Sequence, residues 1–208
     1  MRWVLGLFAL PTLGAQFTSV PYAGNSGPLF SIETVNQPRP GQYRSIRDVD
    51  FRKLAGPRGK RLKNGRYEHT EREGKFVLQF ESVALEHVYY LNQAYALVLY
   101  RLVEGGGSTN NMGTAVIFGL SHRRLTAVQR ITWDVDASRS EKIPRLYSFD
   151  PGRNTVTILS SHYIPGDAHC CISAVDVVTL AWKDSHFEKV SLTTELSEYG
   201  RTQGKKLP

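Results

Sequence analysis

Residues 94–103, with the sequence AYALVLYRLV, are apolar at almost every position. A strand with one solvent face carries apolar residues at every second position, whereas a strand covered on both faces is a continuous apolar run. Tyr95, Val98 and the glycines at 105–107 favour a strand over a helix, because aromatic and β-branched residues prefer strands. The stretch therefore predicts a central strand that is buried on both faces.

Alternating sequence on either side of this stretch indicates more strands. Phe76, Leu78 and Phe80 alternate with less apolar residues, which predicts a strand with one better-buried face. Asn64-Gly65 fits a two-residue hairpin turn. Further turn signals are DPGRN at 150–154 and KDS at 183–185.

The other expected strands cover residues 83–91, 113–120, 125–135, 145–149, 155–163, 175–182 and 187–193. Their spacing predicts a mainly all-β fold, an antiparallel sandwich or open barrel of roughly seven to nine short strands, with an irregular N-terminal lead-in.

The ends of the 208-residue chain differ in composition from its middle. Residues 1–15 have a short positive start, an apolar run and small residues at the end, which predicts a cleaved signal peptide; a buried N-terminal strand is the alternative. Residues 16–44 are rich in Pro and Gly and predict an extended lead-in, residues 45–196 a single β-rich domain, and residues 197–208 a flexible tail. We expect a secreted or periplasmic protein with no transmembrane segment after signal cleavage.

The charge of the chain favours an acidic partner. The 26 Lys and Arg exceed the 19 Asp and Glu, for a formal net charge of +7, which attracts acidic surfaces such as an acidic component of the cell envelope. The cations are densest at residues 52–66, which we interpret as a solvated basic loop. No RNA-binding aromatic motif accompanies them, so nucleic acid is disfavoured as the partner. Binding of an anionic glycan remains a hypothesis for this segment.

The segment HYIPGDAHCC at 162–171 concentrates reactive side chains. The candidate metal ligands are His162, Asp167, His169, Cys170 and Cys171. Thiolate and imidazole are ligands that zinc and copper favour, but adjacent cysteines fit no standard zinc finger. In an oxidising compartment Cys170 and Cys171 can instead form a vicinal disulfide or remain two buried thiols.

Catalytic patterns are incomplete. His169 adjoins Cys170, but neighbours on an extended chain point to opposite faces, which places His169 poorly as a base for that thiol. We therefore favour a non-enzymatic binding or structural module in which Cys170-Cys171 is a local conformational lock, and we assign no catalytic residue and no cofactor. The alternative is a metal-binding protein or metal-dependent enzyme that uses residues 162–171 with zinc or copper.

The Gly166-Asp167 and Cys170-Cys171 pairs, followed by a strand that ends in Trp182, resemble the end of secreted bacterial proteins related to the LppP/LprE lipoprotein family. The similarity extends over residues 48–190. This chain has Ile172 where those proteins place Pro, and YLNQA at 90–94 where they carry an acidic segment, so a calcium-binding role does not carry over. The resemblance implies an envelope location and β architecture, and it implies no activity.

Overall fold

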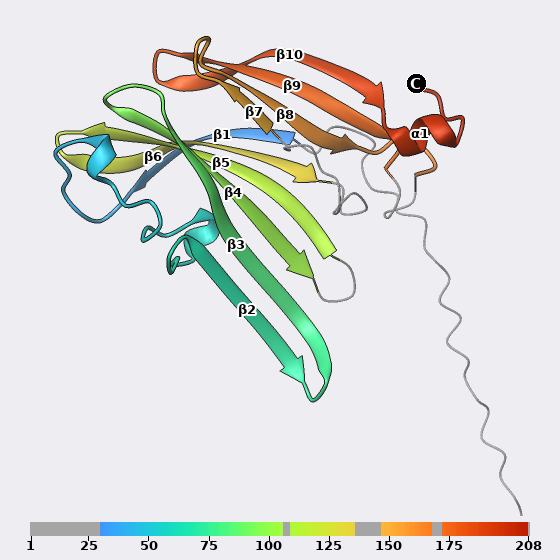
Figure 1. The fold of residues 1–208 in the computed structure, drawn as a ribbon, viewed down its shortest axis with the longest axis horizontal. Helices are drawn as coiled ribbons and strands as arrows, with labels where there is room; N and C mark the ends of the chain where they lie inside the picture. The colour runs from blue at the N-terminus through green and yellow to red at the C-terminus, as the bar shows by residue number, and fades with distance from the viewer. Residues whose placement is uncertain (1–29, 106–108, 136–146, 168–171, 208) are drawn as a thin grey trace, which may run out of the picture.

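A computed structural model describes residues 30–105, 109–135, 147–167 and 172–207. These residues form two antiparallel sheets, one of six strands and one of four (Figure 1). The strand order is β1-β6-β5-β4-β3-β2 in the first sheet and β10-β9-β8-β7 in the second. The prediction of a mainly all-β fold is confirmed. Neither sheet closes into a barrel, and the architecture is sandwich-like.

The six-stranded sheet contains β1 (Phe30–Pro38), β2 (Arg66–Glu73), β3 (Phe76–Tyr90), β4 (Tyr95–Gly105), β5 (Thr109–Ser121) and β6 (Arg124–Val135). The four-stranded sheet contains β7 (Tyr147–Asp150), β8 (Thr155–His162), β9 (Ala174–Lys183) and β10 (His186–Leu196). Two short 3-10 helices, η1 (Ile46–Asp48) and η2 (Pro57–Gly59), lie between β1 and β2, and helix α1 (Glu198–Thr202) follows β10. No helix among the described residues is long and apolar enough to cross a membrane.

Strand β4 is the central strand that the sequence predicted, and it is buried on both faces. Leu97 and Leu99 belong to a first core between the two sheets, while Val98 and Tyr100 belong to a second core on the far face of the six-stranded sheet. All four side chains are 0–2% exposed. The apolar run therefore reflects two cores that share one strand.

The first core is closed by contacts between the sheets. Trp133 of β6 is 1% exposed, and its indole lies so close to Gly113 that a Cβ there would be 2.0 Å from the ring. Gln129 of β6 donates a hydrogen bond to the Phe187 carbonyl (2.9 Å) and accepts one from the Phe187 N–H (2.8 Å). This buried amide thus satisfies its own polar groups and those of an edge residue of β10.

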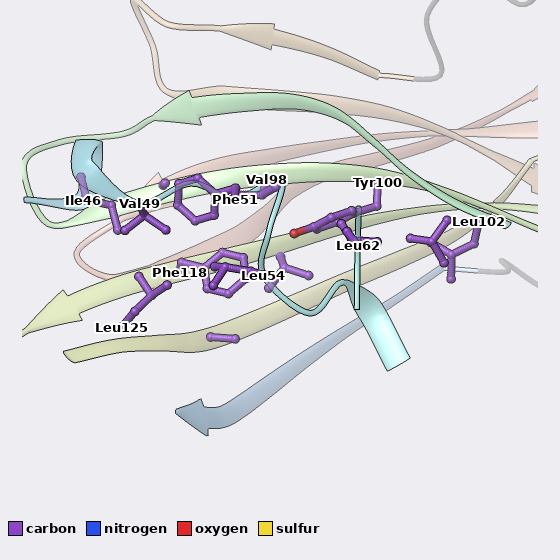
Figure 2. Close-up of a cluster of buried hydrophobic side chains, with 14 residues drawn as sticks. Ile46, Val49, Phe51, Leu54, Leu62, Val98, Tyr100, Leu102, Phe118 and Leu125 are labelled. Atoms are coloured by element: carbon purple, nitrogen blue, oxygen red, sulfur yellow. The ribbon is translucent and has the colours of Figure 1, made fainter. Parts of the chain in front are cut away.

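The second core is covered by residues 39–65, which we call the strap. The strap connects β1 to β2 and crosses the far face of the six-stranded sheet (Figure 1). Its buried anchors are Ile46, Val49, Phe51, Leu54 and Leu62, all between 0% and 7% exposed. Figure 2 shows these anchors among side chains of the sheet, with the Phe51 and Phe118 ring centroids 5.3 Å apart.

The turns that the sequence predicted are present. Asn64 and Gly65 have φ values of 52° and 82°, and Lys63 and Arg66 exchange backbone hydrogen bonds of 2.7 and 3.1 Å across them. Residues 150–154 join β7 to β8, and residues 184–185 join β9 to β10. The polar and glycine residues of these turns supply the conformations that tight reversals need.

Two segments at the ends carry more structure than the sequence indicated. Part of the expected lead-in is strand β1, which pairs with β6 and packs Phe30 and Ile32 against the first core. Part of the expected flexible tail is α1, where a Cβ on Gly200 would lie 2.1 Å from the Ser173 carbonyl oxygen. In both cases contacts with distant strands order a segment whose local composition favours irregular structure.

The hairpin of β2 and β3 extends past the end of β4 as an arm (Figure 1). Pairing of β3 with β4 stops at Phe80 and Gly105, so the tip of the arm pairs only within the hairpin. The sequence placed Leu78 on the better-buried face of its strand, but Leu78 is 49% and Val77 42% exposed. The prediction of a buried face is wrong here because no other strand among the described residues pairs with the tip of the arm.

Candidate functional site

His162, the first predicted ligand, belongs to a polar network that spans three strands. Its Nδ1 lies 2.9 and 3.0 Å from the carboxylate oxygens of Asp176 on β9, and Thr194 on β10 donates a 2.7 Å hydrogen bond to the same carboxylate. The Asp176 side chain is 0% exposed. Because Nδ1 of His162 is directed at this carboxylate, Nε2 is the ring nitrogen that a metal would have to meet.

Sequence reasoning missed Asp176 and Thr194. Both lie outside the 162–171 segment, Asp176 shortly after it and Thr194 on the next strand, and strand pairing brings them together: Asp176 faces Ser160 on one side and Thr194 on the other. An isolated Asp in the strand sequence AVDVVTLAWK was the available signal, because a charged residue at a core position requires a partner.

Asp167, the second predicted ligand, closes the loop between β8 and β9. Its carboxylate accepts hydrogen bonds from the backbone N–H groups of Ile164 (3.0 Å) and Ser173 (2.9 Å), and from the Ser173 hydroxyl. Lys205 Nζ lies 3.7 Å from the same carboxylate, which is 1% exposed. A carboxylate offers about four lone-pair positions, and four donors surround this one. The arrangement favours a structural role for Asp167.

The remaining predicted ligands, His169, Cys170 and Cys171, lie outside the described residues. In the part of the chain that the structure describes, no group of three or more His, Cys, Asp or Glu side chains could hold a metal ion. His162 and Asp167 belong to separate hydrogen-bond networks. The metal site and the vicinal disulfide therefore stay predictions.

The strap carries the strongest concentration of charge. Nine Arg or Lys and two Asp lie within residues 39–65, which gives the strap a net charge of +7. This equals the formal net charge of the whole chain, +7, so the other residues together are neutral. An acidic ligand would be drawn to this face of the molecule before any other.

The strap has the exposed cations expected of a basic loop at residues 52–66, and it is also packed onto the sheet. Its apolar anchors point into the second core, while the cations between them point outward. The exposed cations, which we call the cationic strap surface, are Arg44, Arg47, Arg52, Lys53, Arg61 and Lys63. Burial of the anchors thus holds the backbone beneath these charges in one conformation.

Local hydrogen bonds fix the path of the strap. The Ser45 hydroxyl accepts from the Arg47 N–H (3.2 Å) and the Asp48 carboxylate accepts from the Ser45 N–H (2.9 Å), which forms a capping box on η1. The Tyr43 N–H donates to the Arg123 carbonyl (3.0 Å). The start of the strap therefore lies beside the β5–β6 turn, where Arg123 and Arg124 add two exposed cations.

Some strap cations have partners. Lys60 Nζ lies 2.9 Å from a carboxylate oxygen of Glu81, and this hydrogen bond raises the pKa of the Lys60 ammonium. Lys53 Nζ lies 3.0 Å from Asp50, and the hydrogen bond lowers the pKa of that carboxyl. Arg44, Arg61 and Lys63 form no ion pair among the described residues.

Comparisons of the chain with protein-family models, with curated proteins and with solved structures found no match. The resemblance to the LppP/LprE lipoprotein family consequently remains a prediction from the residues that carry it.

Proposed function

We propose that the protein is an exported, non-enzymatic binding module that holds an acidic component of the cell envelope, an anionic glycan, on the cationic strap surface. The observation that carries the proposal is the strap itself, a segment of net charge +7 that is packed onto a sheet by buried anchors. The signal-like sequence of residues 1–15 supports export, and in this proposal the Cys170-Cys171 pair is a local lock that has no part in glycan binding.

A packed strap suits a polyanion better than a flexible basic loop does. A flexible segment loses conformational freedom when it binds, and this loss reduces affinity. The strap has already lost that freedom on folding, because Phe51 and the other anchors lie in the second core. Its arginines add planar donors that match sulfate, phosphate or carboxylate oxygens.

The buried carboxylates support the non-enzymatic part of the proposal. Asp167 joins the two ends of the β8–β9 loop, and Asp176 links three strands through His162 and Thr194. Both groups have their hydrogen-bonding capacity directed at the protein, so they act as structural links.

The test compares two triple variants that remove the same charge. The strap triple is Arg44→Ala, Arg61→Ala and Lys63→Ala, and the control triple is Arg72→Ala, Lys75→Ala and Lys189→Ala, all at exposed positions. Heparin serves as the probe glycan. The strap triple is expected to elute from a heparin column at clearly lower salt than the wild type. The control triple is expected to elute at nearly the same salt concentration as the wild type. Equal displacement of both triples would show that net charge alone governs retention and would contradict the proposal.

Metal binding by residues 162–171 is the second candidate function. It is supported by the contact of His162 with Asp176, because metal-ligating histidines commonly donate their other ring N–H to a carboxylate. Zinc and copper would be measured by elemental analysis after metal-replete purification of the wild type, His162→Gln, Cys170→Ser and the control His69→Gln. Stoichiometric metal in the wild type and control, lost in the other two variants, is the expected result. Absence of both metals from the wild type would dispose of this candidate.

A further inference from the structure

The far face of the six-stranded sheet also carries a pocket. Strand pairing places Leu102 opposite Met112, Thr114 opposite Thr132, and Arg130 opposite Glu33. With Pro57 of η2, these side chains line a cavity of about 120 Å³. Four neighbouring strands and the strap thus contribute to one small cavity, which we call the Arg130 pocket.

The lining of the Arg130 pocket is amphipathic. Leu102, Met112 and Pro57 supply apolar surface, whereas Thr114 and Thr132 supply hydroxyl groups. Arg130 is the cation of the lining and Glu33, which is 54% exposed, is its anion. Small-molecule sites typically combine an apolar wall with a few polar groups that orient the ligand.

The guanidinium of Arg130 is incompletely paired. Its Nη2 donates a long hydrogen bond of 3.3 Å to the Gln37 side-chain oxygen, and its Nη1 lies 3.8 Å from the carboxylate of Glu33, which is 54% exposed. Its Nε is buried and has no partner among the described residues. The Arg130 side chain is 24% exposed, so water reaches only part of its five donors, and the buried Nε remains without an acceptor among the described residues.

A second cation beside Arg130 increases the local positive potential. Burial lowers the pKa of the Arg39 guanidinium; Tyr100 acts in the opposite sense, and the charge of Arg130 lowers the pKa further. Arg39 Nε and the Tyr100 hydroxyl are likewise buried without partners in the described part of the chain. Burial also raises the pKa of the Tyr100 phenol well above its usual value, so this group stays neutral and adds no negative charge.

We propose that the Arg130 pocket binds a small carboxylate with a short apolar body. The carboxylate accepts hydrogen bonds from the Arg130 guanidinium, which matches planar oxyanions in a two-pronged geometry. The apolar body packs on Leu102, Met112 and Pro57. An ammonium has no acceptor to offer the Arg130 guanidinium, and a neutral alcohol leaves Arg130 incompletely paired.

The test uses three probes with the same six-carbon chain: hexanoate, hexanol and hexylamine. Each is titrated into the full ¹⁵N-labelled chain while amide shifts are followed. Hexanoate is expected to shift the amides of residues 102, 112, 114 and 130–132 and to bind about tenfold or more tightly than hexanol, because a charge-assisted hydrogen bond contributes that much. Hexylamine is expected not to bind. Equal binding of hexanol and hexanoate, or no hexanoate binding, would overturn the proposal.

Variants locate the site. Arg130→Met is expected to weaken hexanoate binding about tenfold or more, whereas Arg124→Met, at an exposed position on the same strand, leaves it unchanged. Met112→Trp fills the cavity while keeping Arg130 and is expected to abolish binding, which keeps the test decisive if Arg130→Met does not fold. Unchanged hexanoate affinity in Met112→Trp would refute the site. The strap triple keeps its hexanoate affinity, so the outcome is independent of glycan binding.

Discussion

Replacing Phe51 by alanine removes the largest apolar anchor of the strap. Phe51 is 3% exposed and packs against Phe118 of β5, with ring centroids 5.3 Å apart (Figure 2). A buried Phe→Ala change costs about 3–5 kcal/mol through lost burial and the cavity left behind. We expect the free energy of unfolding to fall by about 3 kcal/mol, at the lower end of that range, because the strap lies at the surface and can partly collapse into the space.

Urea unfolding followed by tryptophan fluorescence measures this change, and Leu78→Ala is the matched control. Leu78 is 49% exposed on the β2–β3 arm, so its truncation is expected to change stability by no more than about 0.5 kcal/mol. A loss below about 1 kcal/mol for Phe51→Ala would refute the reasoning, because that value describes a loosely attached loop and not a packed strap.

Three further variants test other contacts, each by the free energy of unfolding. Asp167→Ala leaves the Ile164 and Ser173 N–H groups without an acceptor, and we expect a loss of about 2–4 kcal/mol with faster hydrogen exchange at both amides; unchanged exchange would contradict the loop-closing role. Gln129→Leu removes the hydrogen-bond partners of the Phe187 N–H and carbonyl groups, and we expect the free energy of unfolding to fall by about 2–4 kcal/mol. The control Gln79→Leu, at an exposed position, should change it little. Equal losses for the two variants would count against the link between the sheets. Gly113→Ala places a Cβ 2.0 Å from the Trp133 ring, so we expect a loss of about 1–3 kcal/mol and an altered Trp emission; wild-type stability would mean that the indole has another position.

The central part of the fold could be predicted because its signals are local. The apolar run of β4 and the Asn64-Gly65 turn each depend on a few neighbouring residues, and the structure confirms both. The period-two pattern also located β3, β5 and β6 to within a few residues, apart from the exposed tip of β3. Local sequence patterns were therefore enough to predict where strands lie, but not how the strands assemble into sheets.

The features that the sequence did not predict depend on contacts between residues far apart in the chain. Strand β1 is ordered by pairing with β6, about a hundred residues away in the chain, and its polar residues and Pro38 gave no local sign of that pairing. The exposed cations of the strap fit the predicted basic loop, but the sheet face that buries Phe51 and Leu54 could not be located from the sequence. The sequence named His162 and Asp167 as candidates, but Asp176, the partner of His162, and the separation of the two hydrogen-bond networks depend on how the strands pair.

The salt dependence of binding tests the proposed role of the strap most directly. Affinity for a defined heparin oligosaccharide would be measured across a series of salt concentrations for the wild type, the strap triple and the control triple. Each protein cation that meets the polyanion releases roughly one counterion, so the slope of log affinity against log salt should be about two to three units shallower for the strap triple and nearly unchanged for the control. Identical slopes for the two triples would contradict the strap as the binding surface.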